Sequence, residues 1–174
     1  MKRKRDENLN NRIQDSSRKR AFTMGKMKIL FDTSAIKRAI IRMVNRKDTA
    51  YVVGCVAWLS NKDILKAMAK KRGCCIVCTK DRINTKTKKS PLKPAYPGGA
   101  IRIVGEGSGW HKSLMHHKFL IGLDTLGKPL WCTNGSFNMT ESALTNLENL
   151  TIMEDETIAQ CYFDEFKRVH AVSK

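Results

Sequence analysis

The stretch YVVGCVAWLSNKDILKAMAKKRGCCIVCT, residues 51–79, sets the fold class of this protein. An apolar strand pattern at residues 51–59 is followed by helical periodicity at 61–71 and by a second apolar strand pattern at 74–79. Asn61 is a favoured N-cap residue, and Gly73 is a favoured helix terminator. A strand, a helix and a strand in succession predict two parallel strands covered by the helix between them.

The flanking segments continue this alternation. Upstream, residues 28–31 predict a short strand and residues 34–45 predict a helix. Downstream, the patterns predict strands at 101–104, 114–123, 130–136 and 150–153, and helices at 141–147 and 158–169. We therefore expect an α/β fold, a mixed and largely parallel sheet flanked by helices, forming one domain over residues 27–174.

Residues 1–26 differ from the rest of the chain in being polar and without hydrophobic periodicity. They carry two basic clusters, at residues 2–5 and 18–20, and we predict a disordered basic arm. Two interpretations of the clusters stay open: a bipartite nuclear localisation signal, or a solvated tail that attracts nucleic acid.

The composition is strongly basic, with 33 Lys and Arg against 16 Asp and Glu and a formal net charge of +17. Such an excess attracts polyanions, either nucleic acid or an anionic membrane surface. The longest apolar run, residues 51–59, is too short for a spanning helix, and the charged N-terminus does not resemble a signal peptide. We expect no transmembrane segment and no secretion.

The 6 cysteines stand mostly within apolar runs, where a thiol behaves as a small buried hydrophobe. This pattern predicts a reduced, intracellular protein. Cys75 and Cys78 have the CxxC spacing of a zinc site, but no second Cys or His pair lies nearby. A core strand is the interpretation that the neighbouring residues favour.

Between residues 80 and 99 the core pattern stops and positive charge accumulates. The segment reads as a basic loop that forms a candidate nucleic-acid-binding rim, with a solvated loop as the alternative. Its cations are Lys80, Arg82, Lys86, Lys88, Lys89 and Lys93.

The residues that carry chemistry lie in the segments 115–124 and 134–140. Strand alternation puts His116 and Lys118 on one face of a strand and turns His117 to the other. A regular hairpin around Gly127 would pair His116 with Asn138 and Lys118 with Ser136. We therefore expect four polar side chains to converge on one patch.

Such a patch suits a phosphodiester. Lysine supplies a point charge for the non-bridging oxygens, Ser136 and Asn138 supply hydrogen bonds, and a neutral imidazole can attack phosphorus. This chemistry requires no metal and no cofactor. A metal site made of His111, His116 and His117 is the weaker alternative, because no well-placed carboxylate or thiolate joins it. Glu148 could turn back to orient the imidazole of His116, or could be an exposed charge at a helix end.

The elements His116-x-Lys118, Asp124, Gly135-Ser136-x-Asn138 and Glu148-Asn149 resemble the HKD motif of the phospholipase D superfamily. The likeness is greatest to its single-motif members, the bacterial endonucleases and the Zucchini or mitochondrial cardiolipin hydrolase group. This resemblance implies a catalytic set of His116, Lys118, Ser136, Asn138, Glu148 and Asp124. The spacing on both sides of Asp124 is longer than in the family motif, and that residue is thought to be structural in the family.

The resemblance also implies a mechanism. One histidine attacks phosphorus to form a phosphohistidine, and a second histidine protonates the leaving oxygen and then activates water. Two motifs are needed and this chain carries one, so the resemblance implies a homodimer that shares one active site. His117 as the second catalytic histidine is the alternative within one chain.

Three functions are compatible with these observations. The first is a nuclease acting on DNA or RNA, with the basic segments as a track for the backbone. The second is a hydrolase of an anionic phospholipid such as cardiolipin, with peripheral contact to an anionic membrane. The third is a catalytically silent nucleic-acid-binding protein. Tyr96 and Trp110 are the aromatic residues nearest the basic runs, so the sequence predicts little base stacking.

Overall fold

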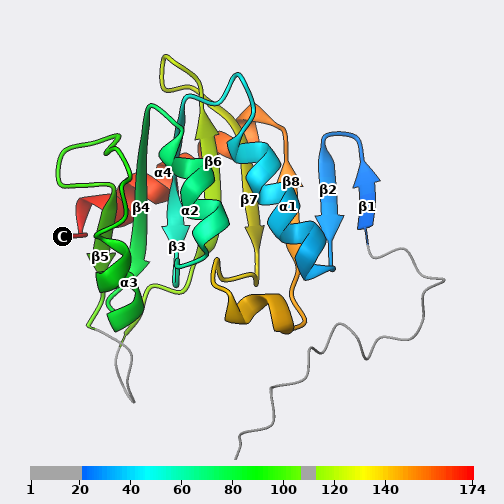
Figure 1. Cartoon of the computed structure of the whole chain (residues 1–174). Coiled ribbons are helices and arrows are strands. Elements are labelled where there is room, and N and C mark those ends of the chain that lie inside the picture. The colour runs from blue at the N-terminus through cyan, green and yellow to red at the C-terminus, as the bar shows by residue number, and fades with distance from the viewer. Residues whose placement is uncertain (1–20, 107–112) are drawn as a thin grey trace, which may run out of the picture.

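One mixed sheet carries the fold, with its strands in the order β1-β2-β8-β7-β6-β3-β4-β5 (Figure 1). The computed structural model describes residues 21–106 and 113–174. The strands are β1 (Ala21–Met24), β2 (Met27–Leu30), β3 (Tyr51–Val56), β4 (Gly73–Thr79), β5 (Ile101–Val104), β6 (Lys118–Leu123), β7 (Pro129–Gly135) and β8 (Leu150–Met153). The helices are α1 (Thr33–Val44), α2 (Lys62–Ala69), α3 (Arg82–Thr87), the 3-10 helix η2 (Ser142–Thr145) and α4 (Glu156–Ala171).

The expected α/β architecture, a mixed sheet flanked by helices, is confirmed, but the expectation of a largely parallel sheet was wrong. Among the described strands, only the β3–β4 and β4–β5 pairs are parallel. The β6–β7 pair is antiparallel because only the turn between Leu123 and Pro129 joins the two strands, and a parallel pair needs a long crossover. The β7–β8 pair is antiparallel as well, across the longer connection that contains η2. The chain also carries β2 away from β3, to pair with β8 at the other side of the sheet.

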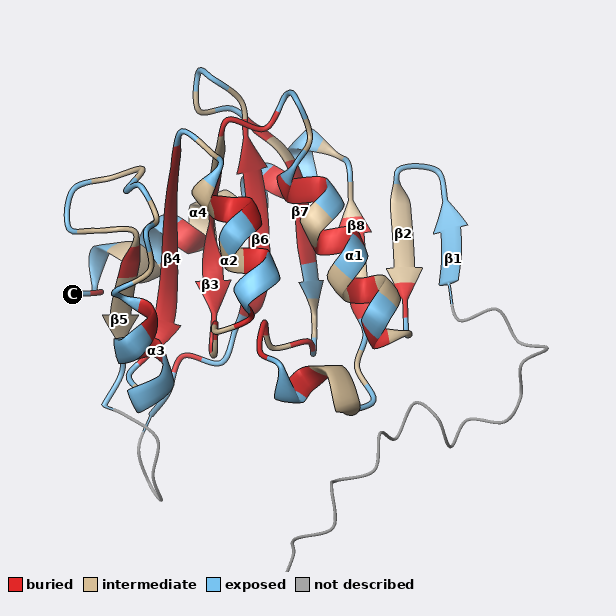
Figure 2. Cartoon of the chain, viewed as in Figure 1, coloured by how far each residue is buried: buried red, intermediate tan, exposed pale blue. Residues whose placement is uncertain are grey.

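The sheet separates two apolar layers. Helices α1 and α2 cover one face and α4 covers the other (Figure 1). Strand alternation sends Val52 and Val56 of β3 into the first layer and Val53 and Cys55 into the second. The central strands β3, β4 and β6 are consequently buried along their length (Figure 2).

Side-chain caps fix where the two covering helices begin. The Asp32 carboxylate accepts a hydrogen bond from the Ala35 amide at 2.6 Å at the start of α1. The expected cap at Asn61 is confirmed, since its Oδ1 atom accepts from the amides of Asp63 and Ile64, both at 3.1 Å. Each cap satisfies backbone donors that the first helical turn leaves without a partner.

Two segments are more ordered than the sequence suggested. Residues 21–24, placed in the disordered arm, form β1, and a tight turn with Gly25 at φ +54° joins it to β2. The folded domain therefore begins before residue 27, while the basic clusters at 2–5 and 18–20 lie outside the described residues. The segment expected as a basic loop contains the short helix α3, capped by Asp81.

The cysteines of the described core are buried thiols. Cys75 and Cys78 pack into different apolar layers, on opposite faces of β4, so the two sulfurs cannot share one zinc ion. Burial raises the pKa of Cys74 and of Cys132 to about 12, which keeps these thiols protonated and unreactive. Cys161 on α4 is exposed.

No helix in the described part of the chain is long and apolar enough to cross a membrane.

Candidate active site

The candidate site lies at one edge of the sheet, where neighbouring strands begin or end. Lys118, the first residue of β6, pairs with Val56, the last residue of β3. Phe119 pairs with Asn134, one residue before the end of β7. The same edge includes the turns that lead into α3 and η2, along the lower border of the sheet in Figure 1. The chain thus brings the two halves of the motif to one border.

His116 and His117 diverge to opposite sides of this border, as strand alternation predicts. The His116 imidazole lies against the Trp58 indole, with ring centroids 5.7 Å apart and planes at 82°. His117 turns toward α4, where its Nε2 atom lies 3.5 Å from a Glu165 oxygen and its ring contacts Phe119. The backbone carbonyl of His117 accepts from the Ala57 amide at 2.8 Å, which holds this segment beside β3. His116 and His117 therefore face different surroundings.

The surroundings of His116 favour the neutral form of its imidazole. Its pKa is lowered from the ordinary 6.5, first by desolvation and then by the charges of Lys118 and His117. The residue is nevertheless exposed, so an incoming substrate can reach the imidazole. A neutral, reachable imidazole is the form that attacks an electrophile at neutral pH.

Lys118 combines a buried stem with a polar contact at its tip. The residue is only 6% exposed, and its Nζ atom donates to the His116 carbonyl at 2.7 Å. Burial lowers the pKa of Lys118, and the negative charge of Glu148 opposes that shift. A partly desolvated ammonium beside the imidazole is a strong anchor for an anionic substrate, because fewer water molecules screen its charge.

Ser136, Glu148 and Asn149 form a linked group across from Lys118. The Ser136 hydroxyl donates to the Glu148 carboxylate and accepts from the Asn149 amide at 3.0 Å. The Ser136 amide in turn donates to Asn149 Oδ1 at 2.8 Å. In the described structure the hydrogen bonds of Glu148 go to Ser136 and Asn146, and not to His116, which was one of its two predicted roles. The loop before β8 aims this carboxylate at the serine.

Asn138 lies on a loop that adjoins Trp58. The amide of its neighbour Met139 donates to the Trp58 carbonyl at 3.1 Å, and the Met139 carbonyl accepts from Ser60 and Asn61 at 2.8 Å. The Oδ1 atom of Asn138 is buried and has no hydrogen-bond partner among the described residues. An unsatisfied buried polar atom is costly, so this position is suited to contact with a ligand.

The hairpin does not have the register expected from its sequence. Leu120 pairs with Thr133 and Gly122 with Trp131, one residue away from the predicted pairing. A bulge between Gly122 and Leu123 shifts the register. His116, Ser136 and Asn138 also lie outside the strands, so their placement depends on loops rather than on cross-strand pairing.

Asp124 does not reach this site, contrary to the catalytic set that the resemblance implied. It occupies the hairpin turn at the far end of β6, where its Oδ1 atom accepts from the amides of Leu126 at 2.8 Å and Lys128 at 2.9 Å. A strand rises about 3.3 Å per residue, so Asp124 lies roughly 20 Å or more from His116. Its role in this chain is to hold the turn.

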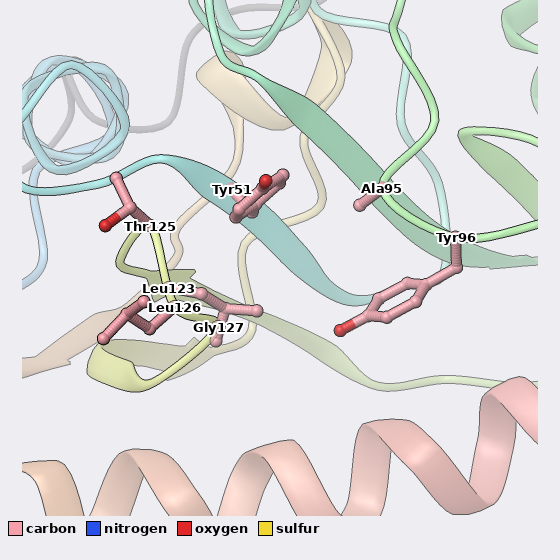
Figure 3. A pocket seen from close by; sticks show the side chains of 7 residues that line it. All are labelled: Tyr51, Ala95, Tyr96, Leu123, Thr125, Leu126 and Gly127. Atoms are coloured by element: carbon pink, nitrogen blue, oxygen red, sulfur yellow. The ribbon is translucent and has the colours of Figure 1, made fainter.

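The pocket in Figure 3 belongs to this far end as well. It encloses about 210 Å³ and is lined by Tyr51, Ala95, Tyr96, Leu123, Thr125, Leu126 and Gly127. Because Tyr51 begins β3 and Leu123 ends β6, the pocket lies at the opposite edge of the sheet from Lys118. Tyr96, the nearer described candidate for base stacking, is therefore remote from the candidate site.

The predicted basic rim reaches the site only in part. Its six cations are all exposed: Lys80, Arg82, Lys86, Lys88, Lys89 and Lys93. Lys80, Arg82 and Lys86 lie on or just before α3, which follows the end of β4 at the border that holds His116. Lys93 lies elsewhere, because its carbonyl accepts from the amide of Cys74 at the start of β4. Of the six cations of the predicted rim, those on or just before α3 are therefore the nearest to the site.

Helix α3 is fastened to the Trp58 loop by two buried side chains. Asn84 accepts from the Leu59 amide at 3.1 Å and donates to the carbonyls of Ala57 and Thr79 at 2.7 and 2.9 Å. Thr87 donates to the Leu59 carbonyl at 2.6 Å. These contacts fix the basic helix next to the candidate nucleophile.

Sequence reasoning missed Trp58 and Asn84. Trp58 closes an apolar run and looked like a core residue, and Asn84 stood among lysines with no visible partner. Asn84 and Thr87 are three residues apart, which places them on the same face of a helix. This spacing was the one signal in the sequence for a buried helix face. His111 and Trp110, also considered for the site, lie outside the described residues.

Known proteins share the fold of this chain. NucT from Helicobacter pylori matches with a TM-score of 0.65 and 13% identity, over 85% of this chain and 97% of NucT. The phospholipase D family member Nuc from Salmonella typhimurium matches with a TM-score of 0.59 and 16% identity, over 85% of this chain and 95% of Nuc. Uncharacterized protein L381 of Acanthamoeba polyphaga mimivirus is 24% identical over 180 residues. That match covers 80% of this chain and 64% of the viral protein.

A family model provides the assignment. The model described as "Cardiolipin synthase, PLD-like domain" matches residues 40–170, which include β3 to β8 and every residue of the candidate site. The span of this match and the fold shared with the two solved structures agree. This chain belongs to the phospholipase D-like family.

Proposed function

We propose that this protein is a metal-independent phosphodiesterase, a nuclease that cleaves DNA or RNA through a phosphohistidine. The observation that supports this most is the pairing of an exposed His116, whose pKa is held below its ordinary value, with a largely buried Lys118 ammonium. The imidazole is a nucleophile, and the ammonium stabilises negative charge on the non-bridging oxygens. Asn138 and Ser136 supply further hydrogen-bonding groups at the same border.

In the first step, a neutral ring nitrogen of His116 attacks phosphorus and the bond to the leaving oxygen breaks. The leaving oxygen takes a proton from a second, protonated imidazole. Lys118 stays positive throughout and offsets the charge that accumulates on phosphorus. Ser136, fixed by Glu148 and by the Asn149 amide, is placed to orient the phosphoryl group rather than to attack it.

In the second step, the same second imidazole takes a proton from water, the water oxygen attacks phosphorus, and the bond to His116 breaks. We propose that this imidazole is His116 of a second copy of the chain, because His117 points away toward α4. Two such groups in one site would share a single proton, and this is the charge state that the mechanism needs. A homodimer with one shared site follows.

Nucleic acid is the substrate that the charge distribution favours. Helix α3 presents Arg82 and Lys86 at the border that holds His116, where they can contact phosphates on either side of the cleaved bond. An anionic phospholipid is the second candidate, and the exposed Ile83 among these cations is the observation that favours it. Both substrates contain the phosphodiester that the site would cleave.

A cleavage assay in EDTA distinguishes the candidates. The wild type, His116→Asn and the matched control His117→Asn are incubated with labelled single-stranded DNA, duplex DNA, RNA and cardiolipin vesicles. We expect the wild type and His117→Asn to cleave a nucleic acid, and His116→Asn to be inactive. Cleavage of the vesicles alone would favour the lipid substrate, and binding without cleavage would favour a silent nucleic-acid-binding protein. Activity that survives His116→Asn would overturn the mechanism.

Subunit mixing tests the shared site. Wild-type and His116→Asn chains are unfolded together, refolded at known ratios and assayed. If both copies of His116 are required, activity follows the square of the wild-type fraction and equal mixing leaves about a quarter, whereas independent subunits leave about half. A linear dependence would contradict the shared site.

A further inference from the structure

Trp58 is an aromatic residue in contact with the candidate nucleophile His116. Its indole and the His116 imidazole form an edge-to-face pair with centroids 5.7 Å apart and planes at 82°. Such pairs contribute about 0.5–1.5 kcal/mol beyond the area that they bury, and they favour particular ring orientations. Trp58 is half-buried, so its side chain is partly enclosed by the protein, beside the exposed His116.

The backbone around Trp58 is fixed from three directions. On one side, the Ala57 amide donates to the His117 carbonyl at 2.8 Å, next to the imidazole itself. On another, the Trp58 carbonyl accepts from the Met139 amide at 3.1 Å, next to Asn138. The following residue, Leu59, is bound through its amide and its carbonyl by side chains of α3. The indole is therefore carried by a segment with little freedom to move.

Both neighbours of Trp58 are tied to groups that the proposed reaction uses. The segment containing His116 lies on one side of it, and the loop containing Asn138 on the other. A rigid ring at this point limits the orientations of the imidazole and excludes water from one of its sides. The reacting nitrogen must be aimed within a narrow range, and a misplacement of about 1 Å can cost on the order of a hundredfold in rate.

We propose that Trp58 is a positioning residue, which fixes the orientation of the His116 imidazole for attack on phosphorus and shields it from water. The proposal rests on the proposed function, in which His116 is the nucleophile. Trp58 itself takes no part in bond making. Its anchoring through Asn84 and Thr87 makes the placement of His116 depend on α3, the helix that carries the basic rim.

Proton NMR titration of the histidine rings tests the shielding without any measure of activity. The chain has 4 histidines, so the ring signals can be assigned by single substitutions. Among the described residues, the charges that act on His116 are those of Lys118 and His117, and Glu148 acts in turn on Lys118. The Trp58 variants keep all three groups. We expect Trp58→Ala to raise the pKa of His116 toward its ordinary value, and Trp58→Phe to leave it low.

His170 is an internal control in the same spectra. It lies in the other apolar layer against Tyr96 and Phe166, and its pKa is lowered by burial. A shift at His116 in Trp58→Ala with His170 unchanged supports the proposal. An unchanged His116, an equal shift in Trp58→Phe, or a parallel shift of His170 that shows general loosening of the fold, would overturn it.

Kinetics on a small diester then test the positioning. With bis(p-nitrophenyl) phosphate we expect Trp58→Ala to lower kcat on the order of ten- to a hundredfold with little change in KM, and Trp58→Phe to restore most of it. A raised KM with unchanged kcat would show that Trp58 binds substrate instead, and would overturn the proposal. Failure of the proposed function is distinguishable, because then the wild type is inactive while the NMR result still holds.

Discussion

Asn84 makes a sharp test of how the basic helix is attached to the site. Its side chain is fully buried and makes three hydrogen bonds: Oδ1 accepts from the Leu59 amide, and Nδ2 donates to the carbonyls of Ala57 and Thr79. In Asn84→Ala the Leu59 amide loses the acceptor that holds it, and two buried carbonyls each lose a donor. Leaving a buried donor unsatisfied costs roughly 1–3 kcal/mol.

The sum of these losses gives the expected magnitude. One orphaned amide and two weakened carbonyls together predict a loss of about 3 kcal/mol in the free energy of unfolding. For a domain of this size that corresponds to a fall in Tm of roughly 6–12 °C. Asn84→Asp should cost more than the alanine at neutral pH, because a buried carboxylate would face two carbonyl oxygens.

Urea denaturation and thermal unfolding measure these changes. Thr85→Ala is the matched control, because Thr85 lies on the same helix, is exposed, and makes one hydrogen bond to the Asp81 carbonyl. We expect that control to change stability by less than about 1 kcal/mol. A loss below about 1 kcal/mol in Asn84→Ala, or an aspartate variant as stable as the wild type, would refute the assignment of Asn84 as the anchor of α3.

Three further perturbations have defined outcomes. Gly122→Ala would make a Cβ atom clash with the fully buried indole of Trp131. We expect the free energy of unfolding, measured by urea denaturation, to fall by about 3 kcal/mol or more, and an unchanged urea midpoint would contradict this packing. Asp124→Ala removes the acceptor of two turn amides and should cost about 1 kcal/mol while kcat stays unchanged, and a large fall in kcat would return Asp124 to the site. The pKa of His116 is lowered from 6.5, so protonation of this nucleophile should inhibit cleavage only at a pH below 6.5. If kcat/KM instead fell on the acid side with a midpoint at or above pH 6.5, the result would contradict a neutral His116.

Local patterns predicted most of the secondary structure, because periodicity and caps are encoded within a few residues. The N-cap at Asn61 and the strand at Ile101–Val104 are both confirmed. Too many parallel strand pairs were predicted. The order and direction of the strands depend on contacts between distant segments, and no local sequence pattern encodes those contacts. The helix α3 was missed because its buried face consists of polar residues, Asn84 and Thr87, rather than apolar ones.

The site was predicted as a set of residues but not as a geometry. The predicted separation of His116 from His117 is confirmed, although both residues precede β6 and so lie outside the strand that the prediction assumed. The cross-strand pairing failed by one residue because the turn is centred one residue before Gly127, with Leu123 opposite Pro129, and the bulge after Gly122 offsets only half of that difference. Trp58 was not predicted as a site residue, because its contact with His116 joins segments that are far apart in the sequence.

The covalent intermediate is the most direct test of the central claim. Enzyme mixed with excess substrate in EDTA is quenched in alkali, under which phosphohistidine persists, and the peptide that contains His116 is analysed by mass spectrometry. The proposed mechanism predicts a phosphorylated adduct on His116 in the wild type and in His117→Asn, and none in His116→Asn. An adduct on another residue, or rapid turnover with no adduct on His116 at any quench time, would contradict it.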